Sequence, residues 1–434
     1  MRVSLAGLAA NIGGIVEESK VFAKAGWRLI PFLMLLYVGN FLDRVNVGFA
    51  ALTMNKDLGI GAEAFGIVGG IFFLSYFLFE VPSNVILERA GAKLWIFRIM
   101  LTWGLVSMAT AFAQGLSSLL ALRFFLGIAE AGFFPGIIFY LGLWFPAAMR
   151  ARYVGLLLCS ISLANIIGAP LSGYILGMDG IAGFHGWQWL FLLEGVPSVV
   201  LAFAVLAWLP NGPNRARWLS DDERTIIKTR LAKEPPHTHA DFWPMLRDVR
   251  IWALAIPDFG IVLSTYGLGL WLPQIVKGFG FTNVETGLAV AAVYVLSSVV
   301  SVLWCLSSDR AGERIRHVAI AALVGASGLV FAAFTLGSFI CIVGMAVGMA
   351  GTLAAISVFW AVPSGILRGT AAAGGIALIN SLANLGGFAG PYLMGWLKAA
   401  SGGYTLGLCA LAAGLTMTAI LIFVVGRTLV PRTA

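Results

Sequence analysis

Two pairs of charged residues lie inside long apolar runs of this sequence. Asp43 and Arg44 are adjacent within the run 27–52, and Arg123 and Glu130 lie together in a later run. Ionised groups are costly inside a membrane, and those that occur there usually line a path for a substrate or for protons. A guanidinium group binds carboxylates well. The two pairs therefore indicate transport of an anion, with a carboxyl group that carries protons.

The spacing of Arg123 and Glu130 leaves two roles open. Seven residues are two helical turns, so both side chains project from nearly the same face, about 10 Å apart along the axis. A long Arg123 side chain could bend toward Glu130, where burial and a nearby cation act in opposite senses on proton binding by a carboxyl group. The pair is either a proton site tuned by Arg123 or a structural ion pair, and we favour the first role for Glu130.

Adjacent residues of a helix point about 100° apart, so Asp43 and Arg44 need not contact each other. Arg44 is the first candidate for binding an anionic substrate, because its guanidinium group is permanently charged and matches a carboxylate. Asp43 is either a second proton carrier or a structural partner of another helix.

Other polar residues of the apolar runs are weaker candidates. Hydroxyl and amide groups suit the oxygens of a small acid, but they can equally bond neighbouring helices. The pocket candidates are Tyr76, Asn165, Tyr266, Gln274, Trp360, Asn380 and Asn384. Three further acids are interpreted as structural: Glu80 and Glu194 as partners of neighbouring helices, and Asp258 as a solvated helix end.

Composition places these residues in a membrane protein. Of 434 residues, 59% are hydrophobic and only 11% are charged, whereas a soluble protein has about 25% charged residues. The net charge of +8 comes from basic residues scattered between apolar runs, which argues against a nucleic-acid partner. The four cysteines are widely spaced in apolar runs, and His237 and His239 lie in a polar loop, so neither disulfides nor a metal site is expected.

A membrane-crossing helix needs roughly 20 apolar residues. This length predicts an all-α protein with twelve crossings, and the Lys and Arg residues gather in the loops of one side, which is typical of the cytoplasmic side. Both termini are therefore expected in the cytoplasm. The predicted crossings are 27–52, 62–86, 94–114, 117–142, 151–177, 187–209, 250–274, 284–307, 316–336, 338–361, 370–397 and 404–426.

The longest polar stretch divides the chain near its middle. Residues 210–249 contain four prolines and many charges, and Ser220 with Glu223 predicts a capping box that opens a short helix. We expect a cytoplasmic N-terminal segment with a short surface helix, two six-helix bundles, a cytoplasmic linker and a cytoplasmic tail. The N-terminal segment comprises residues 1–26, the two bundles 27–209 and 250–426, the linker 210–249 and the tail 427–434.

An internal repeat supports two parallel bundles. ERAGAK at 88–93 follows the second crossing, and DRAGER at 309–314 follows the eighth. Acid and base can pair across helix ends there, and the glycine permits a tight turn. A second, weaker repeat relates Trp144, Pro146 and Arg150 to Trp360, Pro363 and Arg368. The residues expected to gate the molecule in these loops are Glu88, Arg89, Lys93, Asp309, Arg310 and Arg314.

These features resemble the major facilitator superfamily. Three strings are similar to its anion:cation symporter branch, which includes phthalate, tartrate and sugar-acid permeases: NFLDRVNVGFA at 40–50, RFFLGIAEAGFFPG at 123–136 and GGIALINSLANLGG at 374–387. The resemblance implies that Asp43 and Glu130 take part in proton coupling and that Tyr76, Trp360 and Asn380 contact substrate. Sugar-acid permeases typically have Tyr where this chain has Phe41, so a less hydroxylated substrate is expected.

The function predicted is proton-coupled uptake of a small organic carboxylate across the inner membrane by alternating access. Tartrate, phthalate, a hydroxyphenylacetate and a sugar acid all fit. No P-loop string occurs, so a gradient must supply the energy. No enzymatic constellation is present, no cofactor is expected, and the protein is expected to be monomeric. The alternative is a proton-coupled antiporter or exporter of the same fold.

Overall fold

The computed structural model describes residues 5–234, 247–367 and 370–429, and all regular elements in these ranges are helices. The earlier helices are α1 (Leu5–Asp57), α2 (Ala62–Ala90), α3 (Ala92–Ala109), α4 (Leu116–Glu130), α5 (Phe133–Gly142), α6 (Ala147–Ile175), α7 (Gly186–Trp208) and α8 (Asp221–Leu231). The later ones are α10 (Val249–Lys277), α11 (Asn283–Ala311), α12 (Ile315–Phe334), α13 (Ile340–Phe359), α14 (Ala361–Ile366), α15 (Thr370–Ser401) and α16 (Thr405–Thr428). His237, His239 and Arg368 lie outside the described residues.

Long apolar helices are expected in lipid, because every backbone polar group must be bonded within the segment. Eleven segments of the described chain are long and apolar enough to cross a membrane, and α4 with α5 forms one of them. α15 has 32 residues but is not among the eleven; Asn380, Ser381 and Asn384 lower its hydropathy. With α15 included, the helices correspond one to one with the predicted crossings, and the all-α fold class is confirmed.

The first helix differs from its prediction. The sequence suggested a short surface helix in 1–26, but α1 runs without a break from Leu5 to Asp57. Ion pairs hold its polar part against α8: Lys24 Nζ lies 2.8 Å from Glu223 Oε1, and Arg230 Nε lies 3.1 Å from Glu18 Oε1. The charged residues of this part of α1 therefore have partners on α8 while α1 continues without a break. A separate surface helix is not needed to accommodate them.

The fourth crossing is broken directly after Glu130. Gly132 has a φ of +87°, a backbone conformation that favours glycine, and it separates α4 from α5. The Ser83 hydroxyl donates to the Ala131 carbonyl oxygen over 2.6 Å, which satisfies an acceptor at this break. The Glu130 carboxyl group is consequently carried at the C-terminal end of a helix.

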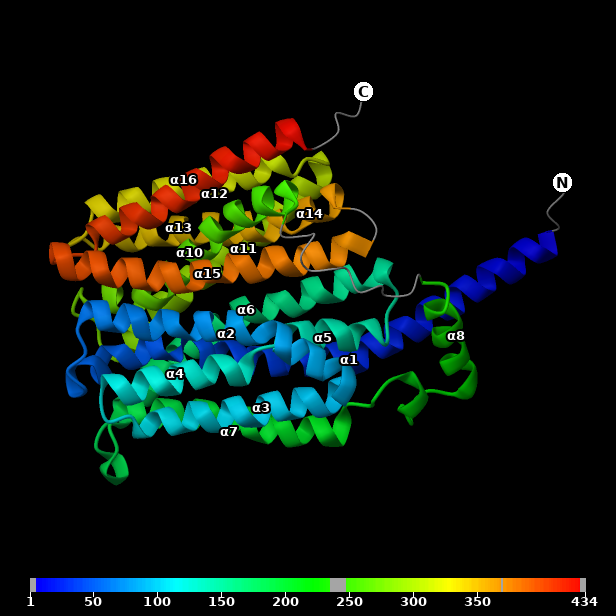
Figure 1. The fold of residues 1–434 in the computed structure, drawn as a ribbon, viewed down its shortest axis with the longest axis horizontal. Coiled ribbons are helices and arrows are strands. Elements are labelled where there is room, and N and C mark those ends of the chain that lie inside the picture. The colour runs from blue at the N-terminus through cyan, green and yellow to red at the C-terminus, as the bar shows by residue number, and fades with distance from the viewer. Residues whose placement is uncertain (1–4, 235–246, 368–369, 430–434) are drawn as a thin grey trace.

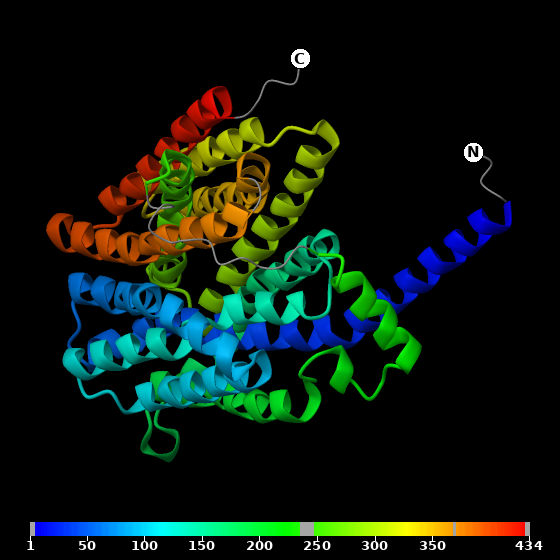
Figure 2. The same cartoon turned by 45° about the vertical axis from the view of Figure 1, so that its right-hand side comes forward.

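The helices form two groups. Figures 1 and 2 show α1–α7, blue to green, on one side and α10–α16, green to red, on the other, with the start of α1 extending beyond both groups beside α8. The arrangement follows the expected division of the chain, while the bounds of the two bundles stay predictions.

The most extensive contacts between the groups, among the described residues, are those of α2 with α15, α6 with α11 and α1 with α10. Glycines allow some of these backbones to touch. A Cβ atom added at Gly66 would lie 2.7 Å from the Pro391 carbonyl oxygen, and one at Gly48 would lie 2.9 Å from that of Leu270. Gly48 and Gly66 flank the α1–α2 turn, so close contact between the groups occurs at this end of the molecule.

Candidate functional site

Arg44 and Glu130 form a buried ion pair between α1 and α4. Arg44 Nε donates to Glu130 Oε1 over 2.8 Å, and its Nη2 also donates to Oε1. The Glu130 side chain is fully buried and that of Arg44 is 10% exposed. The first and fourth crossings thus place the two sequence candidates in direct contact, because the break at Gly132 ends α4 at the level of Arg44.

Aromatic rings surround the Arg44 guanidinium group. Its carbon lies 5.0 Å from the centre of the Phe41 ring, 5.3 Å from that of Phe72 and 5.4 Å from that of Tyr76. Such rings attract cations through their negative faces. Tyr76, a pocket candidate, and Phe41, at the position where sugar-acid permeases have Tyr, therefore both belong to this site.

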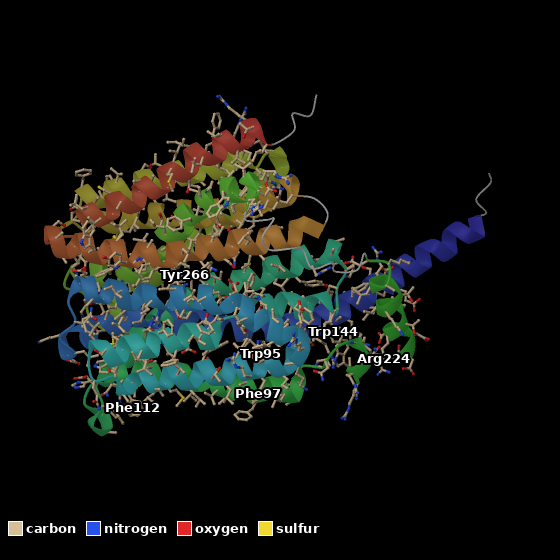
Figure 3. The ribbon with its side chains drawn as sticks, in the orientation of Figure 1. Trp95, Phe97, Phe112, Trp144, Arg224 and Tyr266 are labelled. Carbon is tan, nitrogen blue, oxygen red and sulfur yellow. The ribbon has the colours of Figure 1, made fainter. Side chains whose placement is uncertain are left out.

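The later group of helices reaches the same arginine through α10. The Arg44 Nη1 atom lies 3.1 Å from the Tyr266 hydroxyl oxygen, to which it donates. Figure 3 shows Tyr266 where α10 meets the helices of the first group. The Tyr266 ring also packs on Phe73 of α2, with ring centres 4.3 Å apart. One guanidinium group therefore links the two groups of helices.

Arg123 does not bond Glu130 as the sequence suggested: Arg44 bonds Glu130 Oε1, and Glu130 Oε2 has no hydrogen-bond partner. Arg123 is 1% exposed, and its Nε donates a long hydrogen bond of 3.5 Å to the Val68 carbonyl oxygen. Its guanidinium carbon lies 5.3 Å from the centre of the Phe72 ring, as far as that of Arg44 does. Its Nη1 has no hydrogen-bond partner. Two cations therefore lie beside Phe72.

Asp43 belongs to a different environment from Arg44, as their angular separation predicted. The carboxyl group is fully buried and accepts three hydrogen bonds: from Trp103 Nε1 over 3.0 Å, from the Ser107 hydroxyl over 2.6 Å and from the Ser198 hydroxyl over 2.6 Å. These donors lie on α3 and α7, so Asp43 joins α1 to two neighbouring helices, and its role in proton coupling stays a prediction. Nothing in the sequence singled out the two serines.

Within the part of the chain that the structure describes, the remaining pocket candidates make no hydrogen bond with Arg44 or Glu130. Asn165 donates to the Ile161 carbonyl oxygen of its own helix over 2.9 Å. Trp360 stacks edge-on against Phe359 with ring centres 5.6 Å apart. Asn380 and Asn384 are half-buried on α15, and their proposed contacts with substrate stay predictions.

The other buried acids have varied surroundings. Glu80 accepts a hydrogen bond of 2.7 Å from the Ser381 hydroxyl, which joins α2 to α15 between the groups. Glu194 accepts one of 2.7 Å from the Ser172 hydroxyl. Asp258 is not the solvated helix end that the sequence suggested: it is fully buried and neither carboxyl oxygen has a hydrogen-bond partner. This part of α10 is covered because it packs against α15 and α16.

The repeated loops adopt the turns expected of them. Gly91 and Gly312 have φ values of +84° and +62° at the ends of α2 and α11. Arg314 Nη2 lies 2.6 Å from Asp309 Oδ1, which forms the acid–base pair predicted for the second loop. The other expected gating residues, Glu88, Arg89, Lys93 and Arg310, lie at or near these turns.

Two groups of apolar helices around a buried arginine–carboxylate pair define a membrane transporter rather than an enzyme. Residues 33–391 match the family model described as Major Facilitator Superfamily. The chain belongs to this superfamily and is a multi-pass membrane transporter.

Two relatives resemble the chain in sequence, and one solved structure resembles it in fold. The chain is 46% identical over 414 residues to a protein of Agrobacterium vitis named "Putative tartrate transporter", covering 95% of this chain and 92% of that one. It is 40% identical over 413 residues to the quinolone resistance transporter of Acinetobacter baumannii, covering 94% and 95% of the two chains. A crystal structure of a bacterial homologue of the human lysosomal transporter Spinster superposes with a TM-score of 0.77 at 17% identity, covering 95% of this chain and 97% of that one. The Agrobacterium vitis relative is consistent with the anion:cation symporter resemblance.

Proposed function

We propose that the protein imports a small organic carboxylate together with protons by alternating access. The observation that carries the proposal is the excess of positive charge around one carboxyl group. Arg44 and Arg123 both lie beside Phe72, yet Glu130 bonds only Arg44 and Arg123 Nη1 has no partner. A buried cation without an anion is costly. A substrate carboxylate would supply the missing partner.

Glu130 provides the link to protons. A proton added to Glu130 removes the negative charge that holds Arg44, so Arg44 becomes free to bind the substrate carboxylate. Loss of that proton restores the pair and displaces the substrate. Tyr266 of α10 is uncharged and accepts a hydrogen bond from Arg44. Movement of Arg44 therefore changes a contact between the two groups of helices.

The wider arrangement is part of the proposal. Two bundles at 27–209 and 250–426 rock about the site, with the linker 210–249 and both termini in the cytoplasm and the chain in the inner membrane. The contacts near Gly48 and Gly66 then close the outer end, and the gating loops at 88–93 and 309–314 open and close at the inner end.

Uptake of labelled tartrate into vesicles with an alkaline interior tests the coupling. The wild type should accumulate tartrate, whereas Glu130→Gln should exchange tartrate across the membrane without accumulating it. Glu223→Gln, which alters a carboxyl group of α8 outside the site, is the matched control and should behave as the wild type does. Accumulation by Glu130→Gln at the wild-type level refutes the coupling role.

Export is the second candidate, favoured by the relative named as a quinolone resistance transporter. A proton-driven exporter moves its substrate against the direction of the protons. In the same vesicles with an alkaline interior, protons would flow inward and such an exporter would drive preloaded substrate outward. A thermal-shift comparison reports which charge of substrate the protein binds, because a ligand stabilises the protein that binds it. Carboxylates should raise the melting temperature, and organic cations should not.

A further inference from the structure

A second carboxyl group of the first helix group has no part in the cycle above. Glu194 lies on α7 and is 3% exposed. The Ser172 hydroxyl of α6 donates to its Oε1 over 2.7 Å, whereas its Oε2 has no hydrogen-bond partner. Asp43 accepts three hydrogen bonds, so the two acids differ in how well their charged forms are supported.

The surroundings of the two acids meet between α1 and α7. Ser198 lies one turn after Glu194 on α7 and donates to Asp43 Oδ2 over 2.6 Å. Asn46 lies one turn after Asp43 on α1, is buried, and has an amide group without a hydrogen-bond partner. Because Ser198 bonds Asp43, the turn of α7 that carries Glu194 lies beside the part of α1 that carries Asp43 and Asn46. The carboxyl groups thus lie on neighbouring turns of two helices that pack together.

The other helices packed against α7 present no further charge to Glu194. α3 directs Trp103 and Ser107 to Asp43, and α6 contributes the Ser172 hydroxyl. Among the described residues that these hydrogen bonds bring to this part of α7, Asp43 is the other acid. A change in the protonation of either acid must therefore be felt by the other.

We propose that Glu194 is a proton-binding residue that works as a pair with Asp43, beside the Glu130 site. A proton that leaves the Glu194 carboxyl group is taken up by the Asp43 carboxylate, and no other bond is made or broken. This inference rests on the proposed proton coupling and adds a second carboxyl pair to it. Glu194 is consequently a proton-coupling residue that does not touch the substrate.

Infrared spectroscopy of the purified protein tests the pair without any substrate, so its outcome is independent of the proposed cargo. The stretching band of protonated carboxyl groups is recorded as a function of pH for the wild type, Glu194→Gln and Asp43→Asn. The spectrum of Glu194→Gln should lack one titrating band. It should also show a changed pH midpoint for a second band, the one that is missing from the Asp43→Asn spectrum. A Glu194→Gln spectrum that titrates as the wild type does overturns the proposal.

Ser172→Ala keeps the test decisive where Glu194→Gln does not fold. It leaves the carboxyl group in place and removes its hydroxyl donor, so the Glu194 band should shift in frequency and in midpoint. A band that is unchanged in Ser172→Ala contradicts a titrating Glu194.

Vesicle transport then measures the contribution to coupling. With a gradient of one pH unit, loss of one coupled proton lowers the limiting accumulation of tartrate about tenfold, while exchange of tartrate at equal pH on both sides is kept. Equal loss of accumulation and exchange in Glu194→Gln indicates a structural residue and overturns the proposal.

Discussion

At the scale of single residues, Arg44 makes contacts that no other side chain could reproduce. It donates through Nε to Glu130 over 2.8 Å and through Nη1 to Tyr266 over 3.1 Å. Lysine keeps the charge but lacks the planar fork that reaches two partners at once. We expect Arg44→Lys to lower uptake of a carboxylate by about ten- to a hundredfold, since a hydrogen bond to a charged group contributes about 1.5–3 kcal/mol.

Initial uptake rates in vesicles at matched protein content measure this loss. Arg427→Lys is the control, because Arg427 is exposed at the end of α16. Unchanged uptake by Arg44→Lys would mean that the fork is not used in transport.

Asp43 offers a residue-scale test of its own role. Its two oxygens accept hydrogen bonds from Trp103, Ser107 and Ser198. Asparagine turns one acceptor into a donor that faces another donor, so we expect Asp43→Asn to lower the free energy of unfolding by about 1–3 kcal/mol. Thermal unfolding in detergent measures the effect, with Ser107→Ala as a milder comparison. An Asp43→Asn protein as stable as the wild type would mean that these three hydrogen bonds do not stabilise the fold.

At the scale of elements, α8 is fastened to the first group of helices by charges and rings. The hydrogen bond from Lys24 lowers the pKa of Glu223, and the capping contacts with Ser220 add to this. Trp218, just before α8, stacks on Trp144 with ring centres 5.5 Å apart and planes at 10°. The linker should therefore move together with α1.

The lowered pKa of Glu223 predicts how this attachment depends on pH. A carboxyl group whose pKa is lowered by folding stabilises the folded state above its unfolded value, about 4.3, and loses that contribution as the pH falls through the folded value. Limited proteolysis of the linker should therefore accelerate below about pH 4. In Glu223→Gln, cleavage should be faster already at neutral pH and should change less with acid. An identical pH profile in the variant would exclude Glu223 as the cause.

The glycine contact between α2 and α15 gives a second prediction for elements. A side chain at Gly66 meets the Pro391 carbonyl oxygen at 2.7 Å, and such crowding costs about 1–3 kcal/mol. Gly66→Val should weaken the contact between the groups at the α1–α2 end. Spin labels at the exposed positions 56 and 278 should then report longer distances than in the wild-type background. Gly61→Val, where a Cβ meets nothing within 4 Å, is the control.

At the scale of the whole molecule, the orientation in the membrane is set by charge. The loops that contain the α1–α2 and α10–α11 turns have few Lys and Arg residues, whereas α8 and its neighbours have many, and basic loops stay in the cytoplasm. In a background without the four native cysteines, a membrane-impermeant maleimide should label Gly278→Cys in intact cells. Asp222→Cys should be labelled only after permeabilisation. The reverse pattern would place the N-terminus outside.

Much of the architecture could be predicted because the existence of a membrane helix is a local property. Runs of apolar residues and the charges between them predicted the crossings, and ERAGAK with DRAGER predicted two turns that need glycine, as Gly91 and Gly312 show. The capping box of Ser220 and Glu223 was also readable, and it is present. The straight course of α1 was not predicted, because its polar partners lie about two hundred residues later on α8.

The sequence by itself determined the class of protein and the residues that are costly to bury. Only the tertiary structure decided which of them meet: Glu130 pairs with Arg44 rather than with Arg123, Asp43 is held by serines of two other helices, and Asp258 is covered rather than solvated. The physical reason is that helix formation depends on neighbours in the chain. The partner of a buried charge depends on how helices distant in sequence rotate and pack against one another.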